Sequence, residues 1–73
     1  MTENMKDFLY GLLDNKGRGK EYPVMVNSPE YELTKTAEKQ GFISVRPHQF
    51  SNSCVMVNIT VKGKKALEKE QNV

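Results

Sequence analysis

The fold of this chain is decided by the stretch LTKTAEKQGFISVR (residues 33–46), in which the spacing of the apolar residues changes at Gly41. Before the glycine, Leu33 and Ala37 lie four residues apart, which places them on one face of a helix. After it, apolar side chains recur at every second position, which is the period of a strand. The stretch therefore predicts a helix that ends at Gly41 and is followed at once by a strand.

The start of this helix is also marked in the sequence. Ser28 is a favourable N-cap residue, Pro29 suits the first helical position, and Glu30 complements the positive end of the helix dipole. We therefore predict a helix over residues 29–40. Its buried stripe is narrow, and three residues fall on the opposite, outward face: Tyr31, Lys35 and Lys39.

The strand after Gly41 is predicted to form a hairpin with a second strand. The partner is the alternating run CVMVNITV (residues 54–61), and the polar residues 47–53 between the two strands indicate a loop. If Val45 pairs with Val55, the apolar faces of both strands lie on the same side.

The flanking segments complete a small α+β domain. Residues 3–14 carry apolar side chains at helical spacing and predict an amphipathic helix that Gly17 helps to end. Residues 23–26 predict a short strand, which Pro23 confines to a strand start or a sheet edge. A short helix from Lys64 to about Glu70 follows the hairpin, with a frayed tail over residues 70–73. The predicted domain over residues 1–73 is thus helix, short edge strand, helix, two-stranded hairpin and short C-terminal helix.

Composition excludes several classes of protein. Seventy-three residues suffice for one small domain, and Cys54 and His48 are the only residues of their kinds. We therefore expect no internal disulfide, no Cys/His metal site and no cofactor. No secretory signal and no apolar run of membrane-spanning length are present, so the expected location is cytoplasmic and away from membranes. No carboxylate between Glu38 and Glu68 supports a Cys54–His48 pair, so catalysis is not expected.

The charges are unevenly distributed along the chain. The whole chain carries +2, yet residues 39–67 hold five basic residues and no acidic one, so this segment carries +5 and the remainder −3. Because strands are poor in Asp and Glu in any case, the plain explanation is composition. The functional explanation is a one-sided basic face that binds a polyanion.

Two runs in this half of the chain resemble winged helix-turn-helix DNA-binding domains. AEKQGFI (residues 37–43) is similar to the end of the recognition helix and the first wing strand, and ITVKGKKAL (residues 59–67) is similar to the exit from the wing. Over residues 33–67 the resemblance implies a winged-helix-like fold and DNA binding. The first half departs from the family, because only residues 20–27 are available for the helix that precedes the recognition helix. Either that limb is reduced to a turn, or the match is to a related helix-plus-hairpin fold.

The resemblance implies that the helix over residues 29–40 enters the major groove and that the wing touches phosphates or the minor groove. The same residues are also explained as an ordinary solvated helix face, and the loop aromatic as one that packs on its own hairpin or on a partner subunit. The residues implied in nucleic-acid binding are Tyr31, Thr34, Lys35, Lys39, Arg46, His48, Gln49, Phe50, Asn52, Lys62, Lys64 and Lys65.

The leading functional hypothesis is a small non-enzymatic DNA-binding protein, a transcriptional regulator that docks a helix and a basic wing on double-stranded DNA, as a monomer or as a homodimer. The alternative is a protein–protein interaction module, a small adaptor or inhibitor with the same fold. A basic RNA-binding module is a third hypothesis. The salt dependence of binding separates a polyanion ligand from a protein partner.

Overall fold

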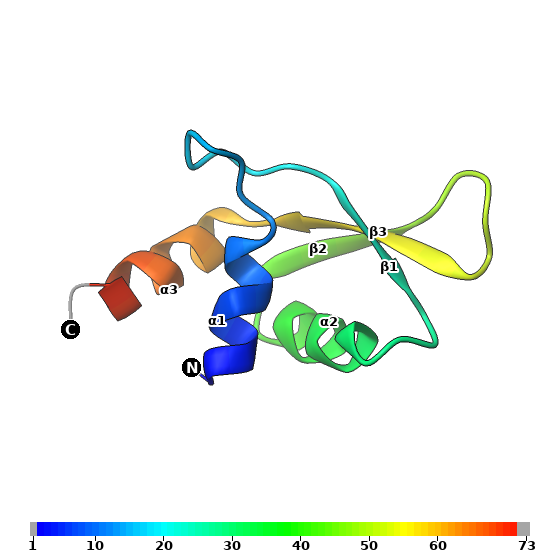
Figure 1. The fold of residues 1–73 in the computed structure, drawn as a ribbon, viewed down its shortest axis with the longest axis horizontal. Coiled ribbons are helices and arrows are strands. Elements are labelled where there is room, and N and C mark those ends of the chain that lie inside the picture. Colours follow the sequence, from blue (N-terminus) through cyan, green and yellow to red (C-terminus); the bar gives the residue numbers. More distant parts are fainter. Residues whose placement is uncertain (1, 72–73) are drawn as a thin grey trace.

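The structure is a computed structural model that describes residues 2–71. Within these residues the chain forms, in order, α1 (Glu3–Tyr10), β1 (Tyr22–Met25), α2 (Glu30–Lys39), β2 (Ile43–Pro47), β3 (Cys54–Ile59) and α3 (Val61–Gln71). The predicted α+β class and the predicted order of elements are confirmed (Figure 1). The predicted frayed tail lies partly outside the described residues, because residues 72 and 73 are not among them.

The sheet is antiparallel with the strand order β1-β3-β2, so β3 is central and the other two strands are edges. Pro23 lies in the edge strand β1, as its missing N–H requires. Val45 of β2 pairs with Val57 of β3, so the predicted pairing of Val45 with Val55 is wrong by two residues. A shift of two residues keeps every side chain on its own face, and for this reason alternation alone cannot detect it.

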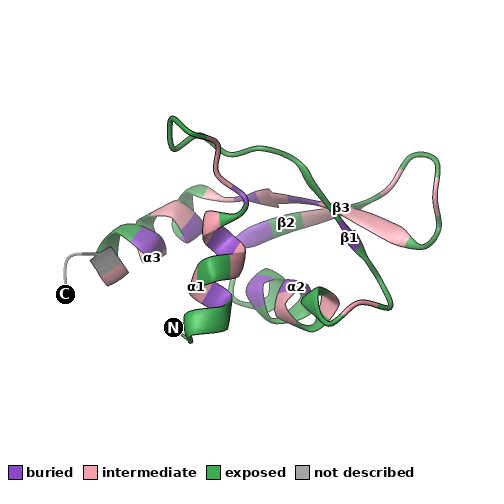
Figure 2. Cartoon of the chain, in the orientation of Figure 1, coloured by how far each residue is buried: buried purple, intermediate pink, exposed green. Residues whose placement is uncertain are grey.

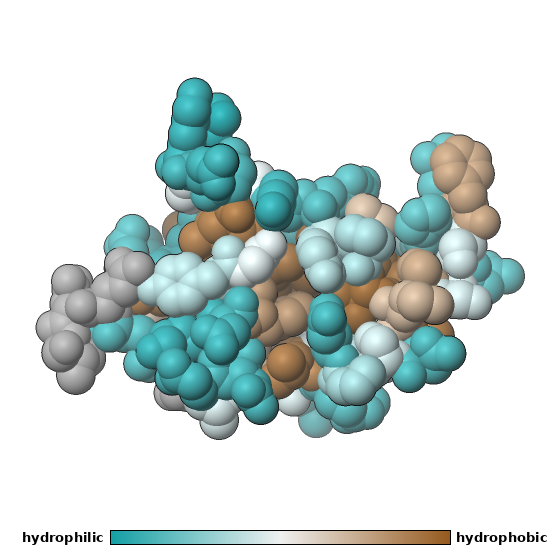
Figure 3. Space-filling view, in the orientation of Figure 1, coloured by the Kyte–Doolittle hydropathy of each residue, from teal (hydrophilic) through white to brown (hydrophobic). Residues whose placement is uncertain are grey.

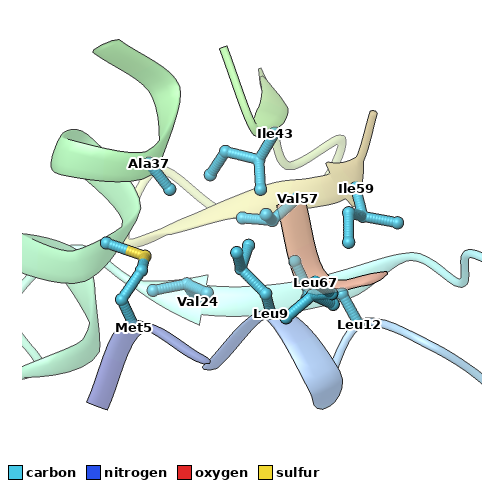
Figure 4. Close-up of a cluster of buried hydrophobic side chains, with 9 residues drawn as sticks. All are labelled: Met5, Leu9, Leu12, Val24, Ala37, Ile43, Val57, Ile59 and Leu67. Atoms are coloured by element: carbon cyan, nitrogen blue, oxygen red, sulfur yellow. The ribbon is translucent and has the colours of Figure 1, made fainter. Parts of the chain in front are cut away.

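The core lies between one face of the sheet and the helices. Helices α1 and α2 pack on this inner face, and α3 extends from the end of β3 (Figure 1). Figure 2 shows that the buried positions lie where the helices meet the sheet, while the two long loops are largely exposed. The opposite, outer face has no helix of the described residues over it (Figure 1). Nine hydrophobic side chains form the buried cluster shown in Figure 4: Met5, Leu9, Leu12, Val24, Ala37, Ile43, Val57, Ile59 and Leu67.

Helix α1 ends at Tyr10, four residues before the predicted end at Asp14. Beyond it the chain forms a 3₁₀-type turn, because the N–H groups of Leu12 and Leu13 donate to carbonyls three residues back. Leu13 then pairs with Gly19 in an isolated bridge, while Leu12 is buried in the core. The apolar spacing thus continues past the helix end, which is why periodicity overextended this helix.

Helix α2 begins at Glu30 with Pro29 as its N-cap residue, and no side chain caps it. Ser28, the predicted N-cap, instead donates its hydroxyl to the Met25 carbonyl at 2.7 Å and closes the turn after β1. This turn, residues 26–29, is all that separates β1 from α2. A turn therefore stands where a helix-turn-helix motif has its first helix.

The end of α2 has the predicted form. Gly41 adopts a φ of 81°, its N–H donates to the Glu38 carbonyl at 3.0 Å, and the Phe42 N–H donates to the Ala37 carbonyl at 2.9 Å. These paired bonds form a Schellman motif, in which glycine is favoured because φ is positive. The predicted helix stop at Gly41 is confirmed.

Thr60 joins the end of α2 to the start of α3. Its hydroxyl donates to the Gly41 carbonyl at 2.7 Å and accepts the N–H of Gly63 at 3.1 Å. Its own N–H donates to the Phe42 carbonyl at 2.9 Å. Because the Thr60 hydroxyl accepts an N–H of the first helical turn, as an N-cap side chain does, α3 begins at residue 61. The predicted start at Lys64 is wrong.

Gly63 allows α3 to pack closely on the hairpin. Glycine is unfavourable inside a helix, so local propensity does not predict that α3 extends across it. A Cβ at this position would lie 2.3 Å from the Phe42 carbonyl oxygen and 2.8 Å from Cγ1 of Ile59. A side chain of any size would therefore push α3 away from the Phe42 backbone.

Candidate nucleic-acid interface

The charged residues that line one groove on α3 are all basic. Lys62, Lys65 and Lys69 follow one another at intervals of three and four residues, which places them on one face of the helix. They line an open groove of about 610 Å³ together with Phe42 and Val61. Among the described residues, no acidic side chain forms an ion pair with any of the three. We call Lys62, Lys65 and Lys69 the lysine patch.

Lys62 is positioned by the junction between α2 and α3. Its ammonium lies 6.0 Å from the centre of the Phe42 ring, which is within cation–π range. A Cβ on Gly41 would lie 3.5 Å from the same ammonium, so Lys62 lies at the C-terminal end of α2, where carbonyl groups attract a cation.

The start of α3 is electrostatically unfavourable for this patch. No acidic residue lies in the first turn of α3, whereas Lys62 and Lys65 lie near it. Cations at a helix N-terminus oppose the helix dipole. An anion bound along the groove would offset that repulsion as well as the repulsion between the lysines.

Lys64 lies away from the patch. It lines a separate cleft of about 420 Å³ between α3 and the turn that follows α1, where Asp14 and Glu68 are also found. Since α3 begins at residue 61, positions 62 and 65 lie about one turn apart on one face of the helix, whereas position 64 projects in a different direction. The three predicted lysines of the wing exit are therefore divided between two faces.

The outward face of α2 carries charges of both signs. Lys35 forms an ion pair with Glu32 at 3.1 Å, and its ammonium lies 5.3 Å from the centre of the Tyr31 ring. Glu30 and Glu38 are exposed as well, so α2 holds three acidic residues against two basic ones. This face has no net attraction for phosphate.

Thr34, one of the residues implied in nucleic-acid binding, lies inside the protein and cannot contact DNA in this structure. It is 1% exposed, and its hydroxyl donates to the Glu30 carbonyl at 3.0 Å. Thr34 and Ala37 fill the buried stripe, while Leu33 is only half-buried. Lys39, in the last turn of α2, is exposed as predicted.

The loop between β2 and β3, residues 48–53, extends away from the core and is called the wing loop (Figure 1). Phe50 is 86% exposed, and Figure 3 shows apolar surface at the tip of this loop. The Phe50 N–H donates to Nδ1 of His48 at 3.0 Å, and the two rings meet edge to face with centroids 6.4 Å apart. Gln49 and Asn52 are exposed in the same loop.

Arg46 is engaged within the protein. Its guanidinium forms an ion pair with Glu21, which precedes β1, so the pair reaches across the outer face of the sheet. A hollow of about 250 Å³ lies beside this pair and is also lined by Met56, His48 and Phe50. Four of the predicted wing residues, Arg46, His48, Gln49 and Phe50, therefore line one hollow, and Asn52 does not.

The turn after α1 contains further basic residues, and Asp14 organises it. The Asp14 carboxylate accepts the N–H of Arg18 at 2.9 Å and the N–H of Lys16 at 2.8 Å. These backbone hydrogen bonds, that of Arg18 first, hold the pKa of Asp14 below its ordinary value of 3.8. Gly17, with a φ of 79°, lies in this turn, so its predicted role in ending α1 is wrong.

The structure separates the predicted residues into those of α2, those near the wing loop and those of α3. The wing loop lies at one end of the long axis, which measures 39 Å, and α3 lies at the other (Figure 1). Lys69 belongs to the α3 group and was not among the predicted residues. Its spacing of seven residues from Lys62 was the available signal.

Comparison with protein-family models, curated proteins and solved structures finds no match to this chain. Across residues 2–71 no helix combines the length and apolar character needed to cross a membrane. Over the same range no group of three or more His, Cys, Asp or Glu side chains is placed to hold a metal ion. The function is therefore inferred from the charge and shape of the surface.

Proposed function

We propose that this chain is a small non-enzymatic DNA-binding protein that docks on the phosphate backbone of duplex DNA through the lysine patch, as a transcriptional regulator would. The observation that supports it is the clustering of three lysines, unpaired with any described acidic side chain, on one face of α3. Lysine ammonium groups contact phosphates without reading bases. Phe42 and Val61 provide an apolar floor against which a sugar can lie.

Helix α2 has a supporting part in this proposal. Its exposed acidic residues, Glu32 and Glu38 among them, would repel phosphates along most of its length. The turn at residues 26–29 also leaves it without the preceding helix that supports a recognition helix. Lys39 adds a positive charge in the last turn of α2, two residues before Gly41, the glycine that Lys62 approaches. We therefore expect affinity for duplex DNA with little discrimination between sequences.

The salt dependence of binding tests the proposal. Three neutralised phosphates give a slope of log affinity against log salt of about −2.7, so affinity falls about 40-fold between about 50 and about 200 mM salt. Fluorescence anisotropy of a labelled random-sequence duplex measures this slope. Absence of binding at the lower salt concentration would refute the proposal.

Single substitutions locate the surface. Lys65→Gln and Lys69→Gln should each weaken binding and reduce the magnitude of the slope by about 1. Lys16→Gln is the matched control, because Lys16 is exposed in the turn after α1 and lies outside the patch. An equal loss in the control would mean that the patch has no special role.

The alternative function, a protein–protein interaction module, is favoured by a different observation. The outer face of the sheet leaves Met25 50% exposed beside half-buried Met56 and Cys54. A chain that binds no duplex at low salt but associates with protein through this face would support the alternative. The two functions use different surfaces, so variants of one surface do not disturb the other.

A further inference from the structure

The outer face of the sheet carries an apolar strip in register. The pairing of β1 with β3 places Pro23 beside Met56 and Met25 beside Cys54. All four positions alternate with the core residues Val24 and Val57 and therefore share the outer face. Aligned apolar side chains on an uncovered face indicate a surface that another protein covers.

The charges on this face favour a second copy of the same chain. Glu21 and Arg46 form an ion pair across the strip, so the face carries one anion and one cation. Glu21 would repel a polyanion. A copy turned about a two-fold axis would instead bring a cation to each anion, because both partners present the same pair in opposite directions.

Proline weakens strand addition at both edges of the sheet. The Val26 N–H donates to the Ser53 carbonyl at 2.9 Å, and the His48 N–H donates to the Cys54 carbonyl at 3.4 Å. Because antiparallel strands alternate the direction of their N–H groups, Pro23 and Pro47 have their nitrogens on the two free edges. Proline has no N–H to donate there. Association through the outer face is therefore favoured over strand addition at an edge.

The wing loop supplies the specific contact. The hollow beside the ion pair measures about 250 Å³, below the roughly 300–1,000 Å³ of small-molecule pockets, and suits a single side chain. Phe50 lines one side of this hollow and is 86% exposed, so its ring is available to a partner. Figure 3 shows the tip of the wing loop standing clear of the rest of the surface.

We propose that two copies of this chain pack outer face to outer face as a symmetric dimer. Phe50 of each copy enters the hollow beside Met56 of the other, and Arg46 of each copy pairs with Glu21 of the other. Three strands of this length cover a face of about 15 by 20 Å, below the roughly 800 Å² per partner of a stable complex. The wing loops extend this area, and the dimer dissociates in the micromolar range. The lysine patch, at the other end of the long axis, stays exposed.

Sedimentation velocity over a range from low to high micromolar concentration tests the association. The native chain should shift from monomer to dimer, and Phe50→Ser should stay monomeric at every concentration. Val61→Ser is the matched control, since Val61 is an exposed apolar residue on α3 outside the outer face and should leave the dimer intact. Circular dichroism verifies that each variant is folded. A native chain that is monomeric throughout, or a Phe50→Ser dimer, would overturn the proposal.

A mixing experiment tests the charge exchange. Glu21→Arg and Arg46→Glu should each be monomeric alone, because the facing surfaces then carry like charges. An equimolar mixture of the two should form a heterodimer in which every cross-interface pair is again opposite in sign. If the ion pair acts only within one chain, mixing restores nothing, and this part of the proposal fails. Neither experiment involves DNA, so its outcome is independent of the proposed function.

Discussion

Gly63→Ala gives the most direct test of how α3 is seated on the hairpin. The new Cβ would lie 2.3 Å from the Phe42 carbonyl oxygen and 2.8 Å from Cγ1 of Ile59. The nearer atom belongs to the backbone, and that oxygen already accepts the N–H of Thr60 at 2.9 Å. The clash therefore cannot be relieved by a side-chain rotation, and α3 has to shift.

The expected size of the effect follows from two opposing terms. Alanine in place of glycine inside a helix stabilises it by about 0.5–1 kcal/mol. Overpacking costs about 1–3 kcal/mol and occasionally more, and a backbone clash belongs at the upper end of that range. We therefore expect Gly63→Ala to lower the free energy of unfolding by about 2–3 kcal/mol, out of roughly 4–11 kcal/mol for a chain of this length. The melting temperature should fall by about 10–20 °C.

Urea unfolding followed by circular dichroism measures this loss, and Gly11→Ala provides the control. Gly11 has an ordinary helical φ of −64°, and a Cβ there would meet its nearest atom, the Phe8 carbonyl oxygen, at 3.3 Å. The control should lie within about 0.5 kcal/mol of the native chain. If Gly63→Ala is as stable as the control, the close packing of α3 on Phe42 is refuted.

Substitutions at three further positions test individual interactions. Thr60→Val keeps the shape of the side chain but removes the hydroxyl that joins Gly41 to Gly63, and should lower the free energy of unfolding in urea by about 1–2 kcal/mol. Thr60→Ser keeps a hydroxyl and should retain most of the stability. Equal stability of the two variants would show that the hydroxyl does not cap α3. Asp14→Asn should flatten the acid limb of a melting-temperature profile: the folded pKa of Asp14 is lowered, so its contribution is present above the ordinary value of 3.8 and is lost as pH falls through the folded value. A native chain whose acid limb matches that of the variant would argue against this contribution. Thr34→Val should leave DNA affinity unchanged, because Thr34 is buried and its hydroxyl is used within α2; a weaker affinity with unchanged stability would show that it contacts DNA.

The fold could be predicted from sequence at positions where the backbone conformation strongly favours one residue type. Gly41 adopts a positive φ that few other residues tolerate, so the end of α2 could be placed from sequence. The inward residues of the hairpin were also predictable, because alternate side chains of a strand point to opposite faces and only the apolar set suits the core. The register was not, because Val45 opposite Val55 or Val57 gives the same pattern of faces.

The candidate site was less predictable, because it depends on where a helix begins. Lys62 and Lys65 share a face only if residue 62 is helical, and that depends on Thr60, whose hydroxyl bonds to a carbonyl 19 residues earlier in the chain. Thr34 was wrongly included among the binding residues, because its hydroxyl bonds within its own helix and a buried threonine of this kind cannot be told from an exposed one by sequence. The sequence also contains no signal that Glu21 is the partner of Arg46.

The bridge made by Thr60 also bears on the order in which the chain folds. The hairpin and the Thr60 hydrogen bonds connect residues within 41–63, so only a short loop has to be closed before these contacts form. The pairing of Val24 in β1 with Val55 in β3 closes a longer loop. We therefore expect the hairpin and both helix caps to be formed in the folding transition state, so that Thr60→Val slows refolding more than it speeds unfolding.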